Sequence, residues 1–264
     1  MAHTIYDNIV LGNKFTDILT TKVDLSSYMT VDTSMTEEAG MKKKVNTYKA
    51  SGEVEDVAMG VGNTKDITVS FESKTYEVKV TQGRFQYYDE QEMTDPLVVE
   101  VGLDGLAKTM INDFTSKAIA EYNKGTQIVT YNKGGQIGFS TVVDAIAMLN
   151  REEDTEGLTL LISPAQVGEF RNNFSEYLKY VEGFVRSGYI GTVCGVPVVV
   201  SKAVPSKTAY LVHKDAVTLF IKKDTEIEQD RDANLRNNIV YARKAAVVAL
   251  TDDTKLVVIK EATA

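Results

Sequence analysis

Residues 95–125 decide the fold, and they read DPLVVEVGLDGLAKTMINDFTSKAIAEYNKG. Apolar side chains recur here at spacings of three and four, the period of one helix face: Val99, Leu103, Leu106, Met110, Phe114, Ala118 and Tyr122. Asp95 suits a helix N-cap, Pro96 suits the first helical position, and Gly125 suits the end. We therefore expect one amphipathic helix of about 29 residues, or ~43 Å, on which other elements lie.

The residues before this helix predict a β-hairpin. Apolar residues alternate with polar ones in two runs: Ile67, Val69 and Phe71, then Tyr76, Val78 and Val80. Period two indicates strands with one apolar face, and residues 72–75 are the expected turn between them. Residues 60–64 (GVGNT) form a further turn-prone cluster upstream. A lone hairpin is marginal in water, so its apolar face needs a surface to lie on, and another subunit is one candidate.

Beyond the helix, short strands and helices alternate. Strands are predicted at 126–132, 158–162, 196–200 and 209–212, and helices at 141–152, 164–172 and 175–185. That order indicates an α/β or α+β unit over about 126–215. Further β-type segments follow at 217–228, 244–250 and 255–259. Residues 1–45 show only weak helical periodicity near Phe15 and indicate an extended arm with a short helix.

Four carboxylates stand at even spacing near the end of this β-rich region: Glu226, Glu228, Asp230 and Asp232. In a strand they would share one face, because side chains alternate between the two faces. One interpretation is a cation site or a docking strip for a basic neighbour. The other is a solvated face offset by Lys222, Lys223 and Arg231, the more usual arrangement for charged strands.

Composition excludes several functional classes. The 264 residues carry a net charge of −8, two histidines and one cysteine, Cys194, so a clustered zinc site and an internal disulfide are excluded. No phosphate-binding loop or serine-nucleophile elbow occurs. A single cysteine suits a reducing cytosol. No apolar run approaches a membrane span, and no secretory signal is visible. The acidic balance disfavours tight nucleic-acid binding. Nothing here recommends an enzyme.

The order of these parts resembles the major capsid protein of tailed bacteriophages, whose fold is shared with encapsulins and the herpesvirus capsid floor. Three stretches carry the resemblance. Residues 85–92 (FQYYDEQE) are similar to the aromatic strand and acidic residues that lead into the family's long helix. Residues 187–201 (SGYIGTVCGVPVVVS) resemble its glycine-punctuated turn and strand, and residues 211–217 (LVHKDAV) resemble the segment that follows.

The resemblance implies an α+β tailed-phage major capsid fold with four parts. Residues 1–45 would be the N-terminal arm and 46–92 an extended β-hairpin loop lying on a neighbouring subunit. Residues 93–125 and 220–248 would form a peripheral domain with the spine helix. Residues 126–219 and 249–264 would form an α/β axial domain. The expected subunit contacts are Gly60, Gly62, Asn63 and Lys65 in the loop, with Glu226, Glu228, Asp230 and Asp232.

By the same resemblance, copies would form pentamers and hexamers, then a procapsid that matures into an icosahedral head around double-stranded DNA. Expected partners are other copies, a portal protein, DNA held non-specifically, and a separate scaffolding protein, since the arm is short. No cofactor, metal, membrane or catalysis is expected. The protein would occupy the virion capsid, and the host cytoplasm during assembly. The alternatives are an encapsulin-type compartment shell and a soluble α/β ligand-binding protein or enzyme.

Overall fold

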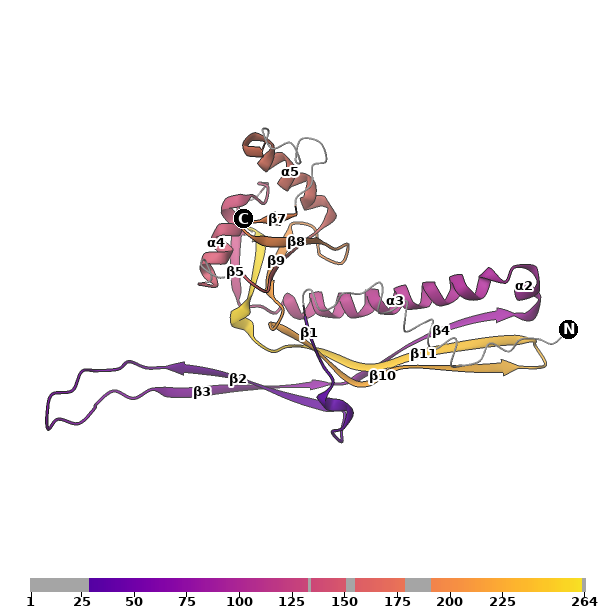
Figure 1. The fold of residues 1–264 in the computed structure, drawn as a ribbon, viewed down its shortest axis with the longest axis horizontal. Helices are drawn as coiled ribbons and strands as arrows, with labels where there is room; N and C mark the ends of the chain where they lie inside the picture. The colour runs from indigo at the N-terminus through magenta and orange to yellow at the C-terminus, as the bar shows by residue number, and fades with distance from the viewer. Residues whose placement is uncertain (1–28, 133, 151–154, 179–190, 263–264) are drawn as a thin grey trace.

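The computed structural model describes residues 29–132, 134–150, 155–178 and 191–262. They form two sheets, a long helix, and a two-stranded hairpin that projects far from the rest (Figure 1). Three sequence predictions fall outside the described residues, wholly or in part. They are the arm helix near Phe15, most of the helix at 175–185, and the first part of the 187–201 stretch.

The predicted long helix is confirmed as α3 (Leu97–Tyr122), which follows the short α2 (Asp89–Thr94). All seven residues of the predicted apolar stripe are buried. The N-cap is Pro96, one residue later than predicted. Asp95 still caps the helix, because its Oδ1 accepts a hydrogen bond from the Leu97 N–H at 3.0 Å. At the other end, the Gly125 N–H donates to the Tyr122 carbonyl at 3.1 Å.

The helix lies on a four-stranded sheet of order β1-β10-β11-β4. The strands are β1 (Thr30–Asp32), β10 (Val217–Asp232), β11 (Asn237–Leu250) and β4 (Lys79–Tyr88). Two glycines set the closeness of the contact. A Cβ on Gly102 would lie 2.2 Å from the Phe85 ring, and one on Gly83 would lie 2.3 Å from Leu106. Because only glycine lacks that atom, these positions let helix and sheet approach closely.

The second sheet has the order β5-β12-β9-β6-β8-β7. Its strands are β5 (Gln127–Tyr131), β12 (Leu256–Glu261), β9 (Thr208–His213), β6 (Leu158–Ile162), β8 (Val196–Val200) and β7 (Thr192–Val193). It packs with α4 (Phe139–Met148) and α5 (Pro164–Leu178) around a shared apolar core. The strands predicted between residues 126 and 259 are all present, and all five residues of β6 are buried, as its continuous apolar character predicted.

The predicted hairpin turn at 72–75 is wrong. Strand β3 (Thr68–Glu77) runs straight through it and pairs antiparallel with β2 (Lys42–Ser51), while Val80 belongs to β4. The error arose because the apolar positions change from odd to even numbers after Phe71. In the structure, the inner half of this segment packs on the body, where Val78 is 3% exposed, and the outer half projects away from it.

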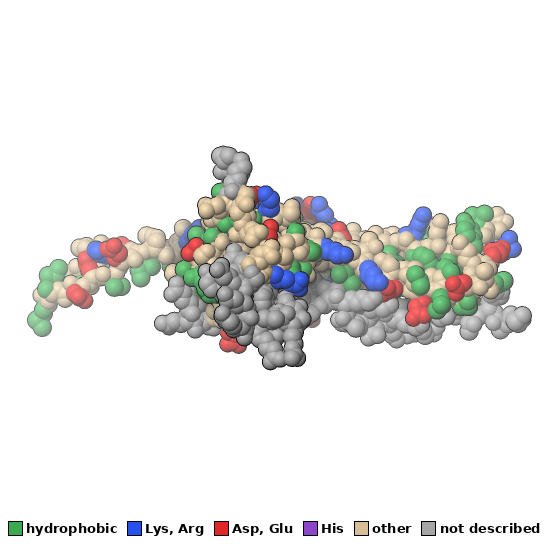
Figure 2. All heavy atoms as spheres, turned by 90° about the horizontal axis from the view of Figure 1, so that it is seen from above, with side chains coloured by type: hydrophobic (Ala, Val, Ile, Leu, Met, Phe, Trp, Pro, Cys, Tyr) green, Lys and Arg blue, Asp and Glu red, His purple; other side chains and the backbone are tan. Residues whose placement is uncertain are grey.

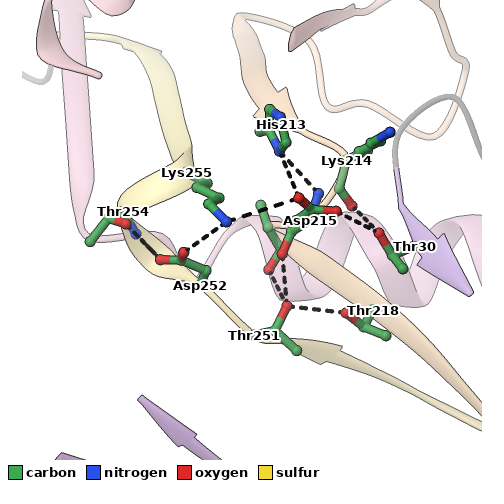
Figure 3. Close-up of polar contacts among 10 residues, drawn as sticks. Thr30, His213, Lys214, Asp215, Thr218, Thr251, Asp252, Thr254 and Lys255 are labelled. Atoms are coloured by element: carbon green, nitrogen blue, oxygen red, sulfur yellow. Dashed lines mark hydrogen bonds and ion pairs between the residues drawn. The ribbon is translucent and has the colours of Figure 1, made fainter. Parts of the chain in front are cut away.

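The two sheets are joined at a polar junction (Figure 3). Asp215, between β9 and β10, is its centre. Its carboxylate accepts a hydrogen bond from Thr30 Oγ1 at 3.0 Å and lies 3.5 Å from His213 Nδ1 and 4.0 Å from Lys255 Nζ. Its carbonyl accepts a hydrogen bond from Thr251 Oγ1 at 3.0 Å. These contacts link β1 to the β9–β10 connection, and that connection to the β11–β12 connection.

Candidate subunit interface

The predicted loop contacts lie together at the tip of the hairpin, in residues 52–67 between β2 and β3. Asn63 Nδ2 donates to the Lys65 carbonyl at 2.7 Å. Lys65 forms an ion pair with Glu53 across the tip, and the Thr64 N–H donates to Glu55. This backbone hydrogen bond lowers the pKa of the Glu55 carboxyl. The tip is therefore braced by its own side chains while it stands away from the body.

The tip is open on every side. Gly60 adopts φ +85°, a conformation that favours glycine, and no atom lies within 4 Å of the Cβ positions of Gly60 and Gly62. Its large apolar side chains are exposed, and they are Val54, Val57, Met59, Val61 and Ile67. Figure 2 shows hydrophobic and charged side chains mixed along this projection. Such a tip can bury its apolar atoms only against another molecule.

The stem of the hairpin, defined as β2 and β3, carries a second exposed apolar surface. Tyr48 lies opposite Phe71 and Ala50 lies opposite Val69, so these four share one face of the ribbon. The two rings are 6.2 Å apart, and their residues are 64% and 66% exposed. Sequence reasoning missed Tyr48 because its face of β2 holds lysine and asparagine at the preceding alternate positions, so no apolar alternation marks that strand.

The four carboxylates near the end of β10 do share one face. They pair with alternate residues of β11 in regular register, beyond two irregularities between Ile221 and Glu226. Arg243 on β11 forms ion pairs with Glu228 and, at 3.8 Å, with Glu226. A hydrogen bond from Lys223 lowers the pKa of Glu226. The half of the strip nearer the junction is thus balanced within the chain.

Two of the three cations predicted to offset this strip point elsewhere. Arg231 is an odd-numbered neighbour, so it faces the other side of the sheet and pairs with Asp89 at 2.9 Å. Lys222 donates to the carbonyls of Met35 and Glu38. Only Lys223 acts as predicted, with Glu226 at 2.8 Å. The outer carboxylates, Asp230 and Asp232, accept hydrogen bonds only from backbone N–H groups in the described part of the chain.

The described residues offer little for chemistry. They contain no group of three or more histidine, cysteine, aspartate or glutamate side chains placed to hold a metal ion. None of their helices is long and apolar enough to cross a membrane. Burial raises the pKa of the Cys194 thiol, which disfavours the reactive thiolate.

Comparison with known proteins decides the class. A family model described as phage capsid protein matches residues 72–259, more than half of the chain. The chain belongs to this family of phage capsid proteins. It is also 26% identical over 246 residues to the major capsid protein of Staphylococcus phage phiMR11, covering 89% of this chain and 86% of the relative.

Solved capsid structures share the fold. The capsid of a native GTA particle matches with a TM-score of 0.70, 11% identity and 91% coverage of both chains. A virus-like particle from Pyrococcus furiosus matches with a TM-score of 0.61, 13% identity, and coverage of 95% of this chain and 97% of the other. These likenesses confirm the predicted capsid fold. The family match and the phiMR11 relative show a phage capsid shell protein, which associates with itself and forms part of the virion capsid.

The division into four parts and the contact residues stay predictions. Two strands begin near the expected boundaries. The extended loop is expected to begin at residue 46, and β2 begins at Lys42. The second segment of the peripheral domain is expected to begin at residue 220, and β10 begins at Val217. The match to the family starts at residue 72, so it excludes the hairpin tip. The role of the tip therefore has to be argued from its own residues.

Proposed function

We propose that copies of this phage capsid protein assemble as pentamers and hexamers into a procapsid, which matures into an icosahedral head around double-stranded DNA. The observation that supports this best is the projecting hairpin. Its tip and stem expose apolar side chains at a distance from the body, and a lone ribbon of this kind is marginal in water. On a member of a capsid family, a neighbouring subunit is the natural surface to receive it.

The acidic strip supplies a second expected contact. Asp230 and Asp232 form no ion pair with any described residue, and they lie at the far end of β10. A basic segment of a neighbouring subunit would neutralise these two carboxylates. In this proposal, Gly60, Gly62, Asn63 and Lys65 act at one contact, and the strip from Glu226 to Asp232 acts at another.

Further partners follow from the same proposal. A separate scaffolding protein directs closure, and a portal protein occupies one vertex. The net charge of −8 suits a shell that encloses DNA without gripping it, because tight phosphate contacts would oppose packaging. Assembly takes place in the host cytoplasm, and the subunit works by contact rather than by catalysis.

Deleting residues 60–65 tests this function. We expect the variant to keep the thermal stability of the wild type, because the tip packs on nothing in the body, and to lose closed shells in electron micrographs. Glu53→Ala is the matched control, since it breaks the ion pair with Lys65 but keeps the tip, and it should still form shells. Normal shells from the deletion variant, or its unfolding, would refute the role given to the hairpin.

The contents of the shell distinguish a phage head from an encapsulin-type compartment. The fold does not distinguish them, because it is also similar to that of a virus-like particle. Particles purified from cells infected by the phage should hold nuclease-protected double-stranded DNA. A shell filled with protein cargo instead would favour the encapsulin-type alternative.

A further inference from the structure

The outer end of the acidic strip combines two carboxylates with a buried amide. From described residues, Asp230 and Asp232 accept hydrogen bonds only through Oδ1, and only from backbone N–H groups. Their Oδ2 atoms are left for another partner. Asn237 on β11 is 7% exposed, and its buried Oδ1 has no hydrogen-bond partner among the described residues. A buried acceptor without a partner is costly, so it points to a group that the described chain does not supply.

The three side chains lie on one face of the sheet. Asp232 is directly opposite Asn237 in the β10–β11 ladder, and Asp230 is two residues before Asp232 on the same strand. Directly opposed residues share a face and have Cβ atoms about 4.5–5.5 Å apart. Residues two apart on a strand share a face as well. The amide oxygen of Asn237 is therefore within reach of an ion held by the two carboxylates.

The arginines close to this end of the strip are already paired. Arg231 and Arg236 lie next to the two carboxylates in the sequence, but they form ion pairs with Asp89 and Glu90 of α2 at 2.9 Å and 2.7 Å. No described lysine or arginine pairs with either of the outer carboxylates. Their two negative charges are therefore available to a cation from solution.

The donor atoms suit calcium. Ca²⁺ binds oxygen ligands, which include carboxylates, amide carbonyls and water. Asp230, Asp232 and Asn234 place oxygen donors at every second residue, as in the first half of a calcium-binding loop. Leu235 and Tyr241 stand where an EF-hand loop has its glycine and its final glutamate, so the turn is not an EF-hand.

We propose that Asp230, Asp232 and Asn237 form a Ca²⁺ site at the end of β10 and β11, with water completing the coordination. The site has two carboxylates and an amide, so it differs from the groups of three acidic, histidine or cysteine side chains that the described residues lack. In the free subunit the ion neutralises both carboxylates. The inference goes beyond the proposed function, in which a basic segment of a neighbour takes the place of the ion on assembly.

Calcium titration of the unassembled full-length subunit tests the site. The protein is first freed of divalent ions, and monovalent salt screens diffuse attraction to the acidic surface. Calorimetry should show one saturable site per chain with a Kd of roughly 10⁻⁴–10⁻³ M, in the range of weak calcium modules, because only two carboxylates contribute. Mg²⁺ should bind at least tenfold more weakly, because it requires a tight octahedral shell and gives up water reluctantly.

Three variants locate the ion. Asp232→Asn removes the charge but keeps the oxygen that accepts the N–H groups of the turn, and it should weaken Ca²⁺ binding at least tenfold. Asn237→Asp converts the buried amide into a third carboxylate and should bind Ca²⁺ at least tenfold more tightly. Glu226→Gln is the matched control. It removes a carboxylate from the same strip that is paired within the chain, and it should change the affinity less than twofold.

The contrary results are equally specific. No saturable binding at millimolar Ca²⁺, equal binding of Ca²⁺ and Mg²⁺, or equal losses from Asp232→Asn and Glu226→Gln would overturn the inference. Unchanged affinity of Asn237→Asp would overturn it too. If Asn237→Asp does not fold, the exposed Asp230→Asn replaces it and should weaken binding at least tenfold, and unchanged binding would again contradict the site. Free subunits are used throughout, so these failures leave the proposed function standing, whereas a wild-type chain that forms no shells would overturn that function alone.

Discussion

Gly102 and Gly105 are both in α3, but Gly102 packs against the sheet and Gly105 faces open space. A Cβ at Gly102 would lie 2.2 Å from the Phe85 ring, whereas nothing lies within 4 Å of that position on Gly105. Alanine is favoured over glycine in a helix interior by about 1 kcal/mol. The substitution Gly105→Ala should therefore stabilise the subunit by about that amount.

Gly102→Ala gains the same helix propensity but overpacks the contact between helix and sheet. Forcing extra atoms into a packed site costs about 1–3 kcal/mol. Phe85 cannot give way freely, because its ring stacks on Tyr87 with centroids 5.7 Å apart. We expect Gly102→Ala to lose about 1 kcal/mol net, which leaves a gap of about 2 kcal/mol between the two variants.

The assay is thermal or urea unfolding of unassembled subunits, followed by circular dichroism. For a protein of this size, the gap corresponds to a difference of roughly 4–8 °C in midpoint temperature, with Gly105→Ala the more stable. If Gly102→Ala is as stable as Gly105→Ala, the spine helix does not approach β4 at this point. The packing of α3 against the β1-β10-β11-β4 sheet would then need revision.

Three other predictions concern titration, assembly and helix attachment. Burial raises the pKa values of Tyr131 and Tyr210 to about 12, so the stability from burying these neutral phenols is complete below pH 10 and falls toward pH 12. Burial also raises the pKa of Tyr76. Absorbance at high pH should show a group of tyrosines, these three among them, that ionise late, and ionisation of every tyrosine near pH 10 would contradict this. Asp230→Lys should change unfolding free energy by less than about 0.5 kcal/mol but reduce shell yield, and unchanged yield would favour a merely solvated strip. Arg231→Ala should cost roughly 1 kcal/mol in urea unfolding, since Asp89 loses a half-exposed ion-pair partner, and no change would show that this pair does not hold α2.

The spine helix could be predicted in detail because its signal is local. Seven apolar residues at helical spacing, with Asp95 before and Gly125 after, specify one face and both ends. The buried strand β6 was equally clear from its continuous apolar run. In both cases the neighbours along the chain carry the information.

The pairing of the hairpin strands could not be predicted from local sequence patterns. The pairing of β2 with β3 joins segments separated by residues 52–67, and no alternation in 42–51 indicates it. The change of apolar phase after Phe71 looked like a turn, although it marks the point where the strand leaves the body. The strand alternation alone predicts that Arg231 faces away from the four carboxylates, because odd and even residues of a strand face opposite sides. Its partner, Asp89, could be identified only from the tertiary fold.

Electron microscopy of the full chain, produced together with the proposed scaffolding protein, tests the central claim most directly. We predict closed, icosahedral particles of megadalton mass, in which the hairpin of each subunit lies on a neighbour. A clean monomer or dimer at high protein concentration, with the scaffold supplied, would contradict the claim that this chain builds a shell.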